Sequence, residues 1–132
     1  MTNAALVMIG GALGSLVRYL ISVWWTALWG EEFPWATLIV NAAGSFGIGL
    51  FAGLTLAGGL LPVPLGFRIF VMVGFFGGFT TFSAFSLQTL QLAQDGHLPW
   101  AAGNIAASVG GCLLAVWLGH SAGIWLNGLF AK

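Results

Sequence analysis

Residues 74–86 read GFFGGFTTFSAFS and lie in the middle of a long apolar stretch. Two adjacent glycines, Gly77 and Gly78, and then two adjacent threonines interrupt it. Glycine is conformationally free and threonine is β-branched, so both weaken a helix. Unwound backbone inside a bilayer leaves N–H and C=O groups unpaired, at several kcal/mol each. The stretch therefore predicts either a broken helix whose free groups face protein, water or an ion, or a glycine-containing helix packed tightly on a neighbour. The residues alone leave both possibilities open.

The composition predicts an integral membrane protein. Of the 132 residues, 59% are hydrophobic and 5% are charged, whereas soluble domains are about one quarter charged. Three acids and three bases cannot cover a surface that faces water. The net charge is zero and there is no basic patch, which excludes nucleic acid as a partner.

Four segments are long and apolar enough to span a bilayer, which takes about 20 residues. They form one expected transmembrane domain over residues 1–132, with approximate spans at 4–29, 35–60, 65–94 and 99–129. The third would be about 45 Å long as a straight helix, which exceeds the hydrocarbon core and again favours a break or a tilt. Small residues recur at helical spacing and allow close helix contact, at Gly10 and Gly14, Gly49 and Gly53, Ala107 and Gly111, and Ala115 and Gly119.

The charges give almost no preferred orientation in the membrane. With four spans, Arg68 and Lys132 lie on one side and Arg18 lies nearest the other. Lys and Arg set the orientation, while acids contribute little. Because the bias is only two against one, the charges allow the chain to insert both ways up, and the alternative is that some other signal sets one orientation.

Several polar residues lie inside the expected spans. An arginine such as Arg18 costs at least about 2.5–3.5 kcal/mol at the centre of a bilayer, so it should face a water-filled vestibule or snorkel to the headgroups. Asn41 lies in the second span, and Asn104, Ser108 and Cys112 follow one another at four-residue spacing in the fourth. Such neutral groups either replace the water shell of an anion or join helices by hydrogen bonds.

The phenylalanines after the glycines share one helix face. Phe82 and Phe85 are one turn apart. Their ring edges carry a partial positive charge, so they either contact an anion or fill space as core side chains.

Three separate segments resemble one family, the Fluc (CrcB) fluoride channels. GFFGGFTTFSAFS resembles that family's GG-x-TTFS-x-FS, and ATLIVNAAGSFGIG (36–49) resembles its TLxVN-x-x-G-x-x-x-x-G. GGALGSLVRYL (10–20) resembles its GGxxGxxxRY. With the length and the four spans, the resemblance covers nearly the whole chain.

The resemblance implies an all-α protein of a bacterial inner membrane that forms an antiparallel, dual-topology homodimer in the lipid bilayer. It implies two pores for passive export of cytoplasmic fluoride, which relieves fluoride toxicity. It also implies a structural sodium ion, held by the backbone carbonyls of Gly77 and Thr80 from both subunits. The residues that it assigns to the pore are Asn41, Phe82, Phe85, Ser83, Ser108 and Cys112, with Arg18 at the vestibule.

Two other function classes fit the residues less well. A small proton-coupled exporter needs an acidic residue at mid-membrane, and the spans contain none. A non-transporting membrane subunit would leave Arg18, Asn41 and the interrupted third span unexplained. An enzyme is not expected, because His97 and His120 lie towards span ends while the acids lie in loops.

Overall fold

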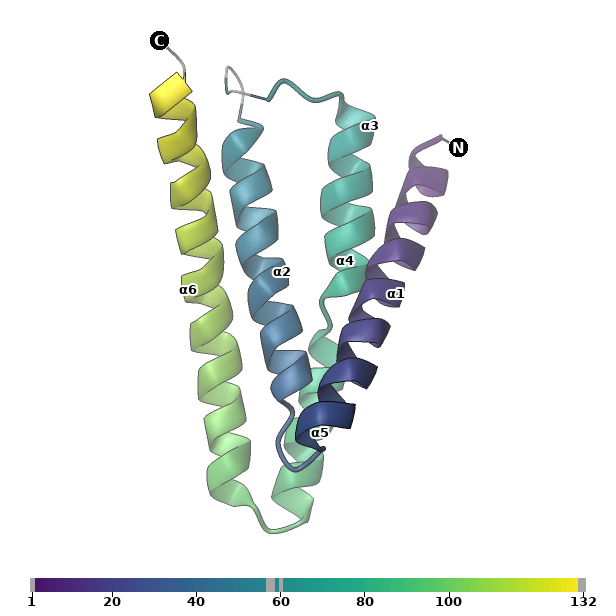
Figure 1. The fold of residues 1–132 in the computed structure, drawn as a ribbon, viewed down its shortest axis with the longest axis vertical. Helices are drawn as coiled ribbons and strands as arrows, with labels where there is room; N and C mark the ends of the chain where they lie inside the picture. Colours follow the sequence, from purple (N-terminus) through teal and green to yellow (C-terminus); the bar gives the residue numbers. More distant parts are fainter. Residues whose placement is uncertain (1, 57–58, 60, 131–132) are drawn as a thin grey trace.

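The computed structural model describes residues 2–56, 59 and 61–130, and these are helical without a strand among them (Figure 1). The helices are α1 (Thr2–Trp29), α2 (Trp35–Leu54), α3 (Leu65–Arg68), the π-helix η1 (Ile69–Phe75), α4 (Phe76–Phe79), α5 (Phe82–Gln94) and α6 (Leu98–Phe130). Four helical stretches are long and apolar enough to cross a membrane: Asn3–Trp29, Trp35–Leu54, Leu65–Gln94 and Leu98–Phe130. The predicted all-helical class with four spans is confirmed.

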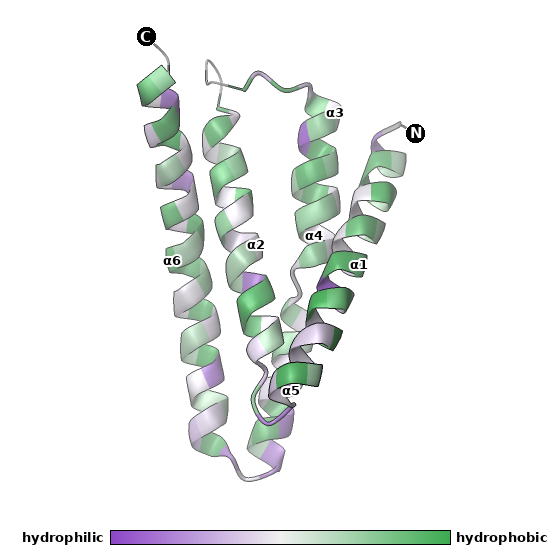
Figure 2. Ribbon diagram, in the orientation of Figure 1, coloured by the Kyte–Doolittle hydropathy of each residue, from purple (hydrophilic) through white to green (hydrophobic). Residues whose placement is uncertain are grey.

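The four stretches run up and down side by side (Figure 1). The start of α1, the end of α2, the start of α3 and the end of α6 lie at one end of the bundle, and the α1–α2 and α5–α6 connections lie at the opposite end. Apolar residues cover most of every helix, while hydrophilic residues gather where α5 turns into α6 (Figure 2). Many large apolar side chains are exposed, such as Trp117 at 62% and Leu113 at 65%, which suits a surface in contact with lipid tails.

The second span ends earlier than expected. Helix α2 stops at Leu54, and the approximate end predicted at Leu60 lies outside the described residues. The Thr55 hydroxyl donates to the Phe51 carbonyl at 2.7 Å, and Nη1 of Arg68 donates to the Thr55 carbonyl at 2.7 Å. The bond from Arg68 satisfies the Thr55 carbonyl at the helix end, and the cation suits the negative end of the helix dipole. Lys132, the other base expected at this end, lies outside the described residues.

Glycines bring α1 into direct backbone contact with the third span. A side chain added at Gly10 would meet the Phe70 carbonyl at 2.5 Å and the Gly74 Cα at 2.9 Å. One at Gly14 would overlap the Phe75 carbonyl. The expected packing faces at Gly10 and Gly14 are therefore confirmed.

Helices α2 and α6 meet in the same manner. A side chain at Gly53 would lie 2.6 Å from the His120 carbonyl, and one at Gly123 would lie 2.7 Å from the Leu50 carbonyl. Gly49 and Gly119 also lie in this contact. Gly111 does not: a side chain there would meet nothing within 4 Å among the described residues, so its expected packing partner is not within the described part of this chain.

The backbone of the third span departs from an α-helix at two places. Between Ile69 and Phe75 it winds as a π-helix, which the sequence pattern did not predict. Helix α4 then ends at Phe79, and Thr80 (φ −87°, ψ 157°) and Thr81 (φ −150°, ψ 116°) are extended before α5 begins.

The extended backbone is shorter than the sequence suggested. A break that begins at the glycines was one of the two possibilities for this stretch, but Gly77 and Gly78 are both helical within α4. Gly78 packs so closely on Gly11 that a side chain there would overlap the Gly11 carbonyl. This contact favours helix at a position where glycine's intrinsic preference does not.

Replacing Gly14 by alanine should destabilise the protein by about 1–3 kcal/mol, because the added methyl group would press on the backbone at Phe75 and Phe79. The matched control is Gly11→Ala, whose methyl group would lie 3.9 Å from its nearest neighbour, the Gly74 carbonyl. Thermal unfolding of the detergent-solubilised protein measures both. Equal stability of the two variants would contradict the close contact.

Candidate functional site

A pocket of about 350 Å³ lies beside the extended residues, between α2, α4, α5 and α6. It brings together five of the six predicted pore residues, Asn41, Phe82, Phe85, Ser108 and Cys112, with both extended threonines, Thr80 and Thr81. The sixth, Ser83, is exposed and does not line it. Gly77 and Arg18 also lie outside the lining.

Asn41 holds the extended backbone from the neighbouring helix. Its Nδ2 donates to the Thr81 carbonyl at 3.0 Å, and the Thr81 N–H donates to Asn41 Oδ1 at 2.7 Å. The Asn41 side chain thus pairs both backbone groups that Thr81 would otherwise leave unpaired in apolar surroundings. Since an amide carries two N–H groups, Asn41 keeps one for the pocket.

Thr81 also starts the next helix. Its hydroxyl accepts from the Ala84 N–H at 3.2 Å, which makes Thr81 the N-cap of α5. The Ser83 hydroxyl lies 3.1 Å from the same oxygen. The predicted pore serine is therefore engaged with the cap and is not itself part of the pocket lining.

The carbonyl groups around the extended residues fall into two sets. Gly78 O accepts from Arg18 Nε at 3.2 Å and from the Ser15 hydroxyl at 3.3 Å, and Thr81 O accepts from Asn41. Gly77 O and Thr80 O have no donor within residues 2–56, 59 and 61–130. In a continuous helix their donors would be the N–H groups of Thr81 and Ala84, but these N–H groups bond to the Asn41 and Thr81 side chains instead.

Arg18 lies against α4. Its Nε bonds to Gly78 O, and the side chain is half-buried. The structure therefore places its positive charge next to the extended segment, and neither pocket is lined by it.

A chain of hydrogen bonds runs from the pocket along α6 and α5. The Ser108 hydroxyl donates to Asn104 Oδ1 at 3.3 Å, and Asn104 Nδ2 donates to the Thr89 hydroxyl at 2.8 Å. The Thr89 hydroxyl donates to the Phe85 carbonyl at 2.7 Å. The predicted stripe of Asn104, Ser108 and Cys112 lies on one face of α6, but only its last two members line the pocket.

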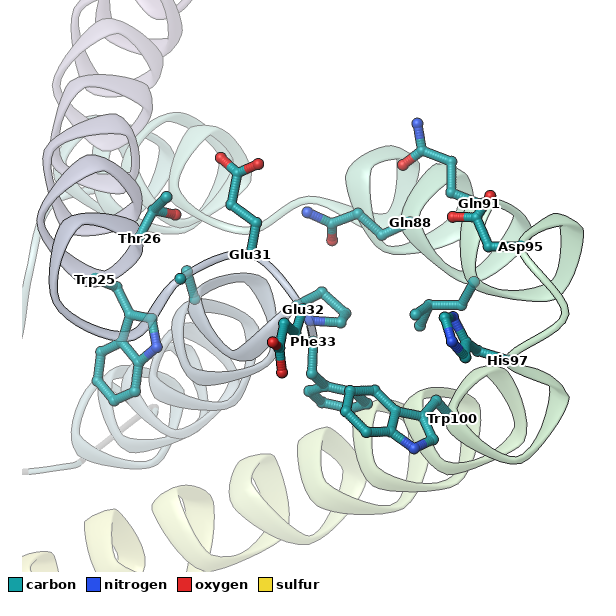
Figure 3. Close-up of a pocket in the computed structure, with 14 residues that line it drawn as sticks. Trp25, Thr26, Glu31, Glu32, Phe33, Gln88, Gln91, Asp95, His97 and Trp100 are labelled. Atoms are coloured by element: carbon teal, nitrogen blue, oxygen red, sulfur yellow. The ribbon is translucent and has the colours of Figure 1, made fainter.

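A larger cavity of about 900 Å³ opens at the end of the bundle, between the α1–α2 and α5–α6 connections (Figure 3). Its lining includes the exposed side chains of Glu31, Glu32 and Asp95, which are all the acids of the chain. Trp25 Nε1 and Gln88 Oε1 also belong to lining residues, and both atoms are buried without a partner in the part of the chain that is described. Buried polar atoms are normally paired, so this cavity should contain water.

Sequence reasoning missed Thr89 and the capping role of Thr81. Thr89 lies one helical turn after Phe85, so the spacing alone places Thr89 on the same helix face as Phe85. The bond from Asn104 to Thr89 depends on how two helices are rotated towards each other, and no spacing within one helix predicts that.

The fold and the pocket define a small multi-pass membrane protein whose helices enclose neutral hydrogen-bonding groups and aromatic rings. The comparisons with known proteins give the family. A model for the CrcB-like family, described as CrcB-like protein, Camphor Resistance, matches residues 5–120. The chain belongs to this family, and it is a multi-pass protein of a bacterial inner membrane.

Relatives with similar sequences carry one name. The chain is 54% identical to the fluoride-specific ion channel FluC of Paramagnetospirillum magneticum, over 96% of this chain and 99% of that protein. It is 53% identical to the fluoride-specific ion channel FluC of Opitutus terrae, over 93% of each chain. It is 52% identical to the protein of that name from Methylobacterium radiotolerans, over 96% of this chain and 88% of the relative.

Replacing Asn41 by leucine should cost about 1–3 kcal/mol of stability, because both backbone groups of Thr81 would lose their partners. Ser45→Ala is the matched control, since Ser45 lines the same pocket from the same helix and makes no hydrogen bond among the described residues. Denaturant unfolding in detergent measures the difference. An Asn41→Leu protein as stable as Ser45→Ala would show that the pair does not hold the segment.

Proposed function

We propose that this protein is a fluoride-selective ion channel that passively exports cytoplasmic fluoride and so relieves fluoride toxicity. The observation that carries the proposal is the pocket that joins Asn41, Phe82, Phe85 and Ser108. Its described lining has no charged residue, so it offers donors and ring edges without a fixed charge that would trap an anion. The names of the relatives support the same ion.

The two phenylalanines differ in a way that favours a second copy of the chain. Their ring centroids are 5.1 Å apart, at an interplanar angle of 54°. Phe85 is 6% exposed, whereas Phe82 is 75% exposed although it lines the pocket. An antiparallel homodimer would cover Phe82 and give one pore per pocket, hence two pores. The weak Lys/Arg bias supports insertion in both orientations.

The carbonyls of Gly77 and Thr80 fit the structural sodium ion that the family implies. Both lack a donor among the described residues, and an added side chain at Gly77 would meet nothing within 4 Å there. Hard cations prefer oxygen ligands, so these two groups and their counterparts in a second subunit would hold the ion. When bound, it would add positive potential beside the pocket.

Arg18 has a supporting role in this proposal. Its Nε donates a hydrogen bond to Gly78 O, and the charge of the guanidinium remains next to the extended segment. A positive charge at this place raises the local concentration of anions without binding one in the pocket.

Liposomes that contain the purified protein should release fluoride and retain chloride. Phe82→Ile or Phe85→Ile should slow fluoride efflux by about threefold to tenfold, because an electrostatic contact with a ring is worth roughly 0.5–1.5 kcal/mol. Phe70→Ile is the control, since Phe70 stacks on Phe67 and does not line the pocket. Absence of fluoride-selective release by the folded protein would refute the channel, and equal effects at all three positions would refute the role of the two rings.

Removal of sodium tests the proposed ion site. After exhaustive dialysis into N-methyl-D-glucamine at constant ionic strength, fluoride efflux should fall, and it should return when sodium is added back. The physical reason is that the carbonyls of Gly77 and Thr80 would face each other across the dimer without a neutralising cation. Efflux and thermal stability that do not depend on sodium would contradict this site.

A further inference from the structure

The two cavities lie along the same face of α6, where the residues that line them, Trp100 and Ser108, are about two turns apart. On α6, Trp100, Asn104 and Ser108 follow one another at four-residue spacing, so they share a face. Trp100 lines the larger cavity and Ser108 lines the smaller pocket. Asn104 lies between them and lines neither.

The neighbouring helices place buried residues at the same level. On α2, Val40 is 0% exposed and lies between Ala36, which lines the larger cavity, and Asn41, which lines the pocket. Asn104 is 1% exposed, and these two are the largest side chains with almost no exposure among the described residues. A closed layer therefore separates the pocket from the open end of the bundle.

On α5, Thr89 lies at this level through its hydrogen bond to Asn104 and lines neither cavity, while Phe85 lines the pocket and Gln88 and Leu92 line the larger cavity. Leu92 is 8% exposed. Asn104 donates one amide hydrogen to the Thr89 hydroxyl at 2.8 Å and accepts from Ser108 at 3.3 Å. Its second amide hydrogen remains available, because the amide nitrogen carries two.

We propose that Asn104 determines selectivity for passage between the two cavities, and that Thr89 is the positioning residue that holds the Asn104 amide across the closed layer. This inference rests on the proposed channel function. An anion that crosses so closed a layer must lose much of its water, and the cost is large unless donors replace it. The Asn104 amide is the donor at this level, and the Ser108 hydroxyl is the next donor along the same face.

Movement of the Asn104 side chain would open the layer. Rotation about its last side-chain bond takes Nδ2 off the Thr89 hydroxyl and turns both amide hydrogens towards an ion. The pair would close again behind the ion, because Thr89 is itself fixed by its bond to the Phe85 carbonyl. An ion that cannot draw the amide away from Thr89, such as a weakly hydrogen-bonding halide, would pass rarely.

Two substitutions at Asn104 separate its donor role from its role in closing the layer. Asn104→Leu keeps the branched shape of the side chain but removes the donors, so fluoride efflux from liposomes should fall about tenfold or more. Asn104→Ala opens the layer, so chloride efflux should rise and the fluoride-to-chloride ratio should fall about tenfold. Thr89→Val keeps the shape of the side chain but frees the amide, so the ratio should fall while the elution volume in size exclusion stays unchanged.

The matched control is Asn127→Leu. Asn127 lies on the same helix and donates its amide to the Gly53 carbonyl at 2.7 Å, but it lines neither cavity. Its replacement should leave the selectivity ratio unchanged. Wild-type efflux from folded Asn104→Leu, or an unchanged ratio in Asn104→Ala and Thr89→Val, would overturn the proposal. If Asn104→Leu does not fold, the fluoride-to-chloride ratio of Thr89→Val tests the proposal. Lack of fluoride-selective efflux from the wild type would instead refute the channel function itself.

Discussion

The structure depends on the need of unwound backbone for partners in apolar surroundings. Two extended residues, Thr80 and Thr81, release N–H and C=O groups that a continuous helix would pair internally. Asn41 on α2 pairs both groups of Thr81, and Arg18 on α1 bonds to the Gly78 carbonyl one turn earlier. Two other helices are thereby tied to the same short segment. The glycine contacts of α1 bring the arginine close enough to reach it.

The same bonds decide which polar groups stay open. Asn41 and the Thr81 hydroxyl take the N–H groups that would pair Gly77 O and Thr80 O in a helix. The segment therefore has one set of carbonyls bonded within the chain and another set without a described donor. Phe82, 75% exposed, follows directly after it. An ion site and a dimer contact at this place would both use what the chain itself leaves unpaired or uncovered.

Much of this architecture could be predicted from the sequence, because it follows from local rules. Apolar length predicted four spans, and the resemblance to the fluoride-channel family assigned five of the residues that line the pocket. What failed depends on contacts between helices. Gly77 and Gly78 are helical because α1 packs against α4. Helix α2 stops at Leu54, where Arg68 reaches the carbonyl of Thr55. The π-helix has no sequence pattern of its own. Such features are set by the relative positions of the helices, which spacing within one helix does not specify.

The distribution of charge favours passage over binding. All three acids line the cavity at the open end of the bundle, and the described lining of the pocket is neutral. A full positive charge inside a pocket of low dielectric would hold a small anion tightly, since charge interactions strengthen as water is excluded. Arg18 avoids this by lying outside the pocket with its Nε on a carbonyl. The asparagine and serine groups that remain can replace water and then release the ion, which conduction requires of each site along a path.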